Sequence, residues 1–169
     1  TPGVAVANGI GVTVVLPSTG RYECEEYNFT NLESNGSIYG VNGTGNAFEF
    51  NGTDYIPIVY PDSALFPKHI NIHQERLILH FPGGQRVHSV SGQPRVFSSV
   101  LGAGSYSTGS ELVGEKTIHG NASAIFCKDS TWLLTGDGVY SDETATRAWI
   151  FYEHDDDVGA EEWSISGRG

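Results

Sequence analysis

The feature that most restricts the fold of this chain is the regular return of short apolar or alternating runs, each followed by turn-forming residues. Asn-Gly pairs at 8–9, 35–36, 42–43 and 51–52 suit tight hairpins, because these residues adopt a positive φ easily. Strands of four to seven residues at this spacing predict an all-β fold with almost no helix. The predicted strands are 11–16, 21–27, 37–41, 46–50, 54–60, 69–73, 76–81, 85–90, 123–128, 131–136 and 147–153.

Two antiparallel hairpins can be placed within this pattern. The first joins 76–81 to 85–90 through Pro-Gly-Gly, and the second joins 123–127 to 131–136 through Lys-Asp-Ser. Both arms of the second hairpin are nearly continuous apolar runs, which indicates a sheet covered on both faces. The residues predicted to be buried there are Ile125, Phe126, Trp132, Leu133 and Leu134.

A loose internal repeat favours propeller blades. Strand–turn–strand units begin at Ser37, Arg76 and Ser123, and these intervals match the length of one blade. The predicted fold is therefore all-β, built from antiparallel hairpins of short strands that resemble propeller blades, with a β-sandwich or barrel as the alternative. The length of 169 residues fits a single domain over 1–169, either complete or a fragment of a longer chain.

The charge of the chain is strongly negative. Twenty acidic and nine basic side chains give a net charge of −11, which argues against a surface that grips nucleic-acid phosphates. The segment 137–162 holds nine of the acids, among them Asp155, Asp156 and Asp157. These acids either keep an outer surface soluble or form a partner surface that borders a passage and repels DNA. No run is long and apolar enough to span a membrane.

The histidines do not have the spacing of a metal or catalytic site. His69 and His73 lie about 13 Å apart on one strand, which is too far for a shared metal ion. His80 and His88 flank the Pro-Gly-Gly turn, where they could approach each other. No nucleophile elbow, zinc-protease helix, phosphate loop or dinucleotide fingerprint is present. The sequence predicts no enzymatic activity, no catalytic residue, no metal and no cofactor.

Two further patterns allow a second function. Five Asn-x-Ser/Thr sequons invite a secreted glycoprotein, although Asn-Gly-Ser/Thr is also ordinary turn chemistry. Trp132, Trp149 and Trp163 lie in or beside predicted strands, where they either pack in the core or form a surface for a sugar ligand. The alternative function is a carbohydrate-binding β module of a secreted or receptor-binding protein. The sequons begin at Asn28, Asn35, Asn42, Asn51 and Asn121.

Four stretches carry a resemblance to a known family: "YGVNGTGNAFEFNGTDYIPI", "FPKHINIHQERLILHFPGGQRVHSVSGQP", "SVLGAGSYSTGSELVGEKTIHG" and "SAIFCKDSTWLLTG". Together they resemble tail proteins of short-tailed bacteriophages, whose β-propeller belongs to the tail tube or nozzle. The resemblance covers roughly residues 36 to 136. It implies a non-enzymatic virion component, assembled in the host cytoplasm, that helps to form a channel for DNA. It also implies a homo-oligomeric ring of six copies that contacts other tail proteins, and it supplies no catalytic residue.

Overall fold

The computed structural model describes residues 3–7, 10–14, 18–32, 36–61, 64–118, 121–136 and 149–161. Over these residues the chain is all-β, as predicted, with one short 3₁₀ turn at Ser99–Leu101 and no α-helix. None of the described residues belongs to a helix that is long and apolar enough to cross a membrane.

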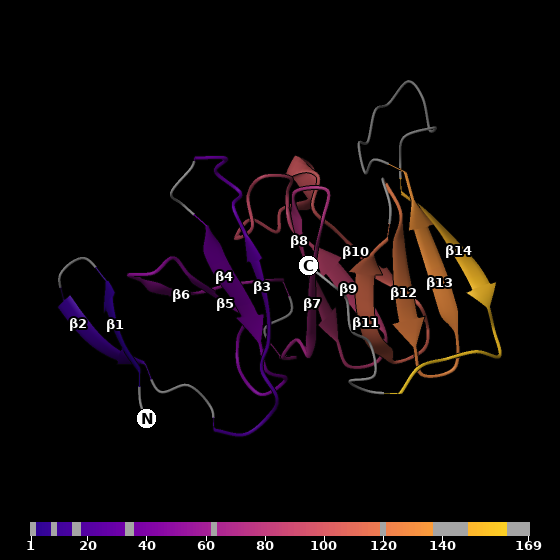
Figure 1. Cartoon of the computed structure of the whole chain (residues 1–169), viewed down its shortest axis with the longest axis horizontal. Helices are drawn as coiled ribbons and strands as arrows, with labels where there is room; N and C mark the ends of the chain where they lie inside the picture. The colour runs from indigo at the N-terminus through magenta and orange to yellow at the C-terminus, as the bar shows by residue number, and fades with distance from the viewer. Residues whose placement is uncertain are drawn as a thin grey trace.

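The strands form one N-terminal hairpin and three four-stranded antiparallel sheets, shown side by side in Figure 1. The hairpin pairs β1 (Gly3–Ala7) with β2 (Ile10–Val14). The first sheet contains β3 (Glu23–Tyr27), β4 (Ser37–Val41), β5 (Phe48–Phe50) and β6 (Tyr55–Pro57). The second sheet contains β7 (His69–His73), β8 (Arg76–Phe81), β9 (Gln85–His88) and β10 (Gly104–Ser107). The third sheet contains β11 (Leu112–Thr117), β12 (Ser123–Cys127), β13 (Thr131–Thr135) and β14 (Ile150–Asp155).

Each four-stranded sheet is a meander, because its strand order follows the order of the chain. Ser37, Arg76 and Ser123, the predicted starts of the repeat, begin β4, β8 and β12, which are the second strands of the three sheets. Both predicted hairpins are confirmed as β8–β9 and β12–β13. The sequence did not predict β1, β10 or β11, and the last two lie in a stretch rich in glycine and serine.

The three sheets pack against one another through their first strands. β7 contacts β3 on one side and β11 on the other, so the second sheet lies between the first and the third. This face-to-face packing of four-stranded meanders resembles neighbouring propeller blades. Within the described residues the three sheets do not close into a ring or a barrel.

Side chains of the Asn-Gly turns close two of the connections. Asn42 Oδ1 accepts hydrogen bonds from the backbone N–H groups of Thr44 at 3.0 Å and Gly45 at 2.9 Å. Asn51 Oδ1 accepts equivalent bonds from the two residues at the same positions in its own turn. Gly43 has a φ of +73°, which glycine adopts without a Cβ clash. Turn chemistry therefore accounts for the Asn-Gly-Thr sequences at these two sites.

An apolar core fills the space between the first and second sheets. β8 contributes Leu77, Leu79 and Phe81, and all three are fully or almost fully buried. The first sheet contributes Tyr39 and Val41 from β4. Burial of side chains of this size stabilises a fold by about 1.5–3 kcal/mol each, so this interface is a main source of stability.

The hairpin β12–β13 is less buried than the sequence predicted. Ile125 and Leu134 are fully buried, but Phe126, Trp132 and Leu133 are only partly buried. The register puts Phe126 and Leu133 on the face that points away from the second sheet. Although both strands of this hairpin are apolar, only the face toward the second sheet is well buried within the described part of the chain.

Candidate functional site

The second sheet turns a polar face toward the third sheet. Alternation along β7, β8 and β9 gathers histidine and arginine side chains on this face. His80 is paired with Arg86 and His88 with Ile78, so the two histidines lie in neighbouring rows and are not opposite each other. The two rows that cross the sheet are His69–His80–Arg86 and Asn71–Ile78–His88.

Glu115 of β11 is the centre of a buried hydrogen-bond network between the two sheets. Arg86 donates from Nε to Oε2 at 2.7 Å and from Nη2 to Oε1 at 3.1 Å. The Nε2 of His80 lies 3.0 Å from Oε2, and Ser123 Oγ donates to Oε1 at 2.8 Å. At most 1% of the surface of each of these four residues is exposed. The carboxylate thus accepts four hydrogen bonds in the absence of bulk water.

The charges in this network are fixed by its geometry. Burial raises the pKa of Glu115, but the charge of Arg86 and the bonds from His80 and Arg86 outweigh it and hold that pKa well below its usual range. Burial lowers the pKa of His80 in spite of its bond to Glu115. At neutral pH the network is therefore an arginine–glutamate ion pair with a neutral histidine whose Nε2–H donates to the carboxylate.

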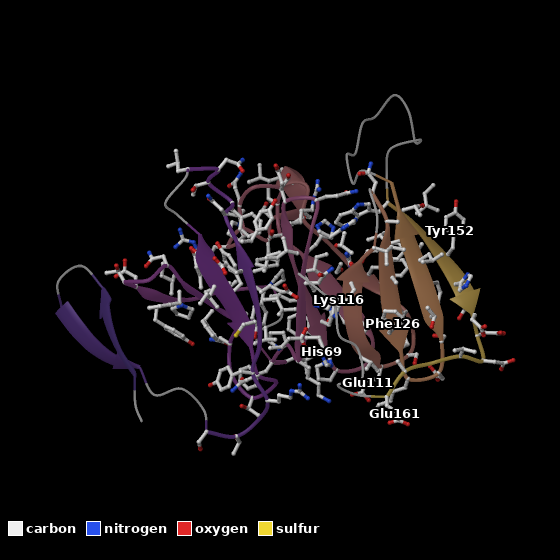
Figure 2. All side chains as sticks on the ribbon, in the orientation of Figure 1. His69, Glu111, Lys116, Phe126, Tyr152 and Glu161 are labelled. Atoms are coloured by element: carbon white, nitrogen blue, oxygen red, sulfur yellow. The ribbon has the colours of Figure 1, made fainter. Side chains whose placement is uncertain are left out.

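Polar side-chain contacts connect the three sheets near their first strands. His69 Nδ1 lies 2.8 Å from Glu23 Oε2, and Lys116 Nζ lies 2.7 Å from Glu25 Oε1. Glu111, just before β11, binds the Nζ of Lys68 at 3.0 Å (Figure 2). The two lysine–glutamate pairs are partly exposed, and pairs of this kind contribute about 0–1 kcal/mol each, so they align the sheets more than they stabilise them.

A pocket of about 690 Å³ opens where β8–β10 meet the start of β14, and we call it the Arg–Trp pocket. Its volume lies within the range of small-molecule sites, roughly 300–1,000 Å³. Two arginines, one histidine and three aromatic rings face the pocket, together with the small residues that precede and begin β10. Its described lining is Arg76, Arg86, His88, Ser99, Val100, Leu101, Gly102, Ala103, Gly104, Ser105, Tyr106, Trp149 and Phe151.

Trp149 packs over the cationic side of this pocket. The Cζ atoms of Arg76 and Arg86 lie 5.1 and 4.9 Å from the centroid of its ring. The His88 ring meets it edge to face at 4.6 Å, and the indole N–H donates to Gln74 Oε1 at 2.7 Å. Cation–π contacts of this length are favourable and hold both guanidinium groups at the pocket wall.

His88 presents an acceptor to the pocket. Its Nδ1 donates to the carbonyl of Ser89 at 3.1 Å, which leaves Nε2 as the acceptor of the neutral ring. Burial lowers the pKa of His88 to about 4, so the ring is neutral at pH 7. A Cβ at Gly104 would lie 2.9 Å from that Nε2, so glycine at this position keeps the space beside the acceptor open.

The structure separates the residues that the sequence proposed as a surface. Trp149 lines the pocket, whereas Trp132 lies outside it, with its indole N–H bonded to Ser130 Oγ at 3.1 Å. Trp163 lies outside the described residues. Asp155, Asp156 and Asp157 lie at the end of β14, the strand of the third sheet farthest from β11. Asp155 Oδ1 accepts the backbone N–H groups of Asp157 and Val158, so it closes a turn there.

Sequence reasoning missed Arg86 and Glu115, the two charged residues at the centre of the interface. Arg86 is a charged residue within a strand otherwise made of apolar or neutral positions, which was an available signal, whereas Glu115 stands next to Lys116 in β11 and carried no such signal. Among the described residues no group of three or more histidine, cysteine, aspartate or glutamate side chains could hold a metal ion. Comparison of the chain with protein-family models, curated proteins and solved structures finds no match.

Proposed function

We propose that this chain is a non-enzymatic structural component of a bacteriophage tail tube or nozzle, in which its three sheets are one part of a ring that surrounds the DNA passage. The observation that carries the proposal is the apolar surface at each end of the row of sheets. The resemblance of residues 36–136 to tail-tube propellers supports it. In this proposal the protein works in the virion tail after assembly in the host cytoplasm.

The first end is the face of the first sheet that points away from the second. Ile38 and Phe50 are cross-strand neighbours there, and 42% and 37% of their surfaces are exposed. The opposite end is the outer face of the third sheet, where Ile150 and Tyr152 on β14 are 42% and 52% exposed. Figure 2 shows Tyr152 at the outer strand of that sheet. Exposed apolar side chains grouped on a sheet face mark a surface that another element covers.

The partner that fits both ends is another copy of the chain. The outer face of the third sheet in one copy would pack on the outer face of the first sheet in the next, in the manner of the two interfaces within the chain. Such a head-to-tail contact is heterologous and closes into a ring when the rotation per copy allows it. Six copies, and contacts with other tail proteins, are what the family resemblance adds to this picture.

Native mass spectrometry of two variants tests the proposal. Tyr152→Asp and Ile38→Asp each place a charge on one end only, and we expect each variant alone to be monomeric. A mixture of the two should form a one-to-one dimer, because one junction between intact ends remains. Val100→Asp, at a side chain that is 92% exposed and away from both ends, should assemble like the unmodified chain. An unmodified chain that stays monomeric, or a mixture that forms no dimer, would refute the proposal.

A further inference from the structure

Two Asn-Gly-Thr turns of the first sheet, at Asn42 and Asn51, share one kind of cap but differ in their surroundings. In both turns the asparagine Oδ1 accepts the backbone N–H groups of the second and third residues that follow it, at 2.7–3.0 Å. Asparagine followed by glycine is prone to lose its side-chain amide, because glycine has no Cβ to shield the backbone nitrogen that attacks it. The same reactive dipeptide therefore occurs in two environments.

The turn at Asn42 is held in place by its neighbours. Asn42 is only 5% exposed, and its Nδ2 donates to the carbonyl of Thr19 at 3.3 Å. The backbone N–H of Gly43 donates to the carbonyl of Pro67 at 2.9 Å. A Cβ at Gly43 would lie 3.1 Å from Lys68 Cγ, so this lysine side chain packs against the turn. Both the amide that would leave and the nitrogen that would attack are therefore engaged.

The turn at Asn51 is open to water. Asn51, Gly52 and Thr53 are all exposed. Neither the Nδ2 of Asn51 nor the backbone N–H of Gly52 makes a hydrogen bond to any residue that the structure describes. Gly52 has a φ of +92°, and a Cβ added there would meet no atom within 4 Å. The nitrogen of Gly52 can therefore move onto the side-chain carbonyl carbon of Asn51 without displacing a neighbour.

We propose that Asn51 is a site of spontaneous deamidation through a cyclic imide formed with Gly52. The backbone nitrogen of Gly52 loses its proton and attacks Cγ of Asn51. The new N–Cγ bond forms as the Cγ–Nδ2 bond breaks, and Nδ2 takes up a proton and leaves as ammonia. The two N–H groups on Oδ1 stabilise the negative charge that develops on this oxygen. Water is the co-reactant, because it then adds across one of the two C–N bonds of the imide and opens the ring.

The opened ring gives two products. Hydrolysis at Cγ leaves aspartate at this position, and hydrolysis at the main-chain carbonyl leaves isoaspartate, in which the chain runs through Cγ and gains a methylene group. Aspartate keeps the cap, because a carboxylate accepts the same two N–H groups. Isoaspartate lengthens the connection between Phe50 and Tyr55, which are paired across β5 and β6. Either product adds a negative charge to the turn.

Peptide mapping of the full chain by mass spectrometry tests this assignment. The folded chain is incubated in mildly alkaline buffer, and conversion of Asn51 and Asn42 is followed in the same sample. Asn51 should convert at least about tenfold faster, because Asn42 and Gly43 must first break their hydrogen bonds. The products at Asn51 should include isoaspartate, which the cyclic imide yields and direct hydrolysis of the side-chain amide does not. Equal rates, faster conversion of Asn42, or an Asn51 that stays unchanged would overturn the proposal.

The unfolded chain and one variant are the controls. In urea both asparagines keep the same local sequence, Asn-Gly-Thr, and lose the bonds of the folded state, so their rates should converge. A preference for Asn51 that persists undiminished in urea would refute the structural assignment. Asn51→Gln should strongly slow conversion in its peptide, because the longer side chain disfavours ring closure with Gly52. Conversion of that variant at the unmodified rate would exclude the imide.

Discussion

The second sheet meets its two neighbours through opposite chemistry. Toward the first sheet, β8 presents Leu77, Leu79 and Phe81, which pack in an apolar core. Toward the third sheet, the same strand presents Arg76 to the Arg–Trp pocket and His80 to a buried network of hydrogen bonds. One strand can do both because successive side chains point to opposite faces of the sheet.

The two interfaces contribute differently to the fold. The apolar interface depends on the area removed from water, and it tolerates exchanges among side chains of similar volume. The polar interface gains little net stability over an apolar one, because the cost of desolvating Arg86 and Glu115 offsets much of their attraction. The polar interface instead requires a specific geometry, because four donor groups must reach the two oxygens of the Glu115 carboxylate. We expect this requirement to fix the orientation of the third sheet relative to the second.

Removing the carboxylate of Glu115 should have the largest effect. Glu115→Ala leaves Arg86 as an uncompensated buried charge, and we expect the free energy of unfolding to fall by about 3–5 kcal/mol. Urea denaturation followed by circular dichroism measures this. Glu111→Ala is the matched control, because that glutamate pairs with Lys68 and Lys128 at the partly exposed edge and should cost about 1 kcal/mol or less. Equal losses would show that the network is not buried as described.

Conservative substitutions should have the next largest effects, and the loss of stability should be smaller at the apolar interface than at the polar one. Leu79→Ile keeps the volume in the apolar core and should cost less than about 1.5 kcal/mol. Arg86→Lys keeps the charge but loses the paired bonds to Glu115, and it should cost about 1.5–3 kcal/mol. Both losses can be measured from the urea midpoint at constant slope. A smaller loss of stability for Arg86→Lys than for Leu79→Ile would contradict this difference between the two interfaces.

Acidification should weaken the polar interface before the apolar one. Burial lowers the folded-state pKa of His73, His80 and His88 from the ordinary value of 6.5, and that of His88 falls to about 4. Between these pH values the unfolded chain takes up protons that the folded chain does not, so the stability present at pH 7 falls as the pH is lowered. Urea midpoints from pH 7 to pH 5 should decline, since most carboxylates titrate below this range.

Two histidine variants check the source of that decline. His88→Gln should reduce the slope of stability against pH, because it removes one of the buried groups. His154→Gln, at an exposed histidine on β14, should leave the slope as it is. A slope that responds to His154 and not to His88 would place the effect outside the interface.

Much of this fold follows from local sequence patterns. Asn-Gly and Pro-Gly-Gly turns delimit the strands, and the starts of β4, β8 and β12 were placed at Ser37, Arg76 and Ser123. β10 and β11 escaped prediction because glycine and serine weaken the apolar signal along 99–120. The burial of Phe126 and Leu133 was overestimated because periodicity shows which side chains share a face and says nothing about what covers it.

The candidate site was largely beyond sequence reasoning. Trp149 was named in advance as either a core residue or part of a ligand surface, but its grouping with Arg86 and Glu115 depends on two sheets whose charged residues are 29 positions apart in sequence. A buried ion pair leaves no spacing rule in the chain, because each partner needs only the correct face of its own strand. Its one trace is Arg86, a charged residue in a predicted strand, whereas Glu115 lies in a strand that the sequence did not predict.

A double-mutant cycle between Arg86 and Glu115 tests most directly whether the second and third sheets meet through a buried polar network. The free energies of unfolding of Arg86→Met, Glu115→Leu and the double variant would be compared with that of the unmodified chain. Each single change should be strongly destabilising, and the double variant should recover much of the loss, with a coupling energy of about 2 kcal/mol or more. Losses that add to within about 0.5 kcal/mol would show that the two side chains do not form a buried pair, and the account of this interface would fail.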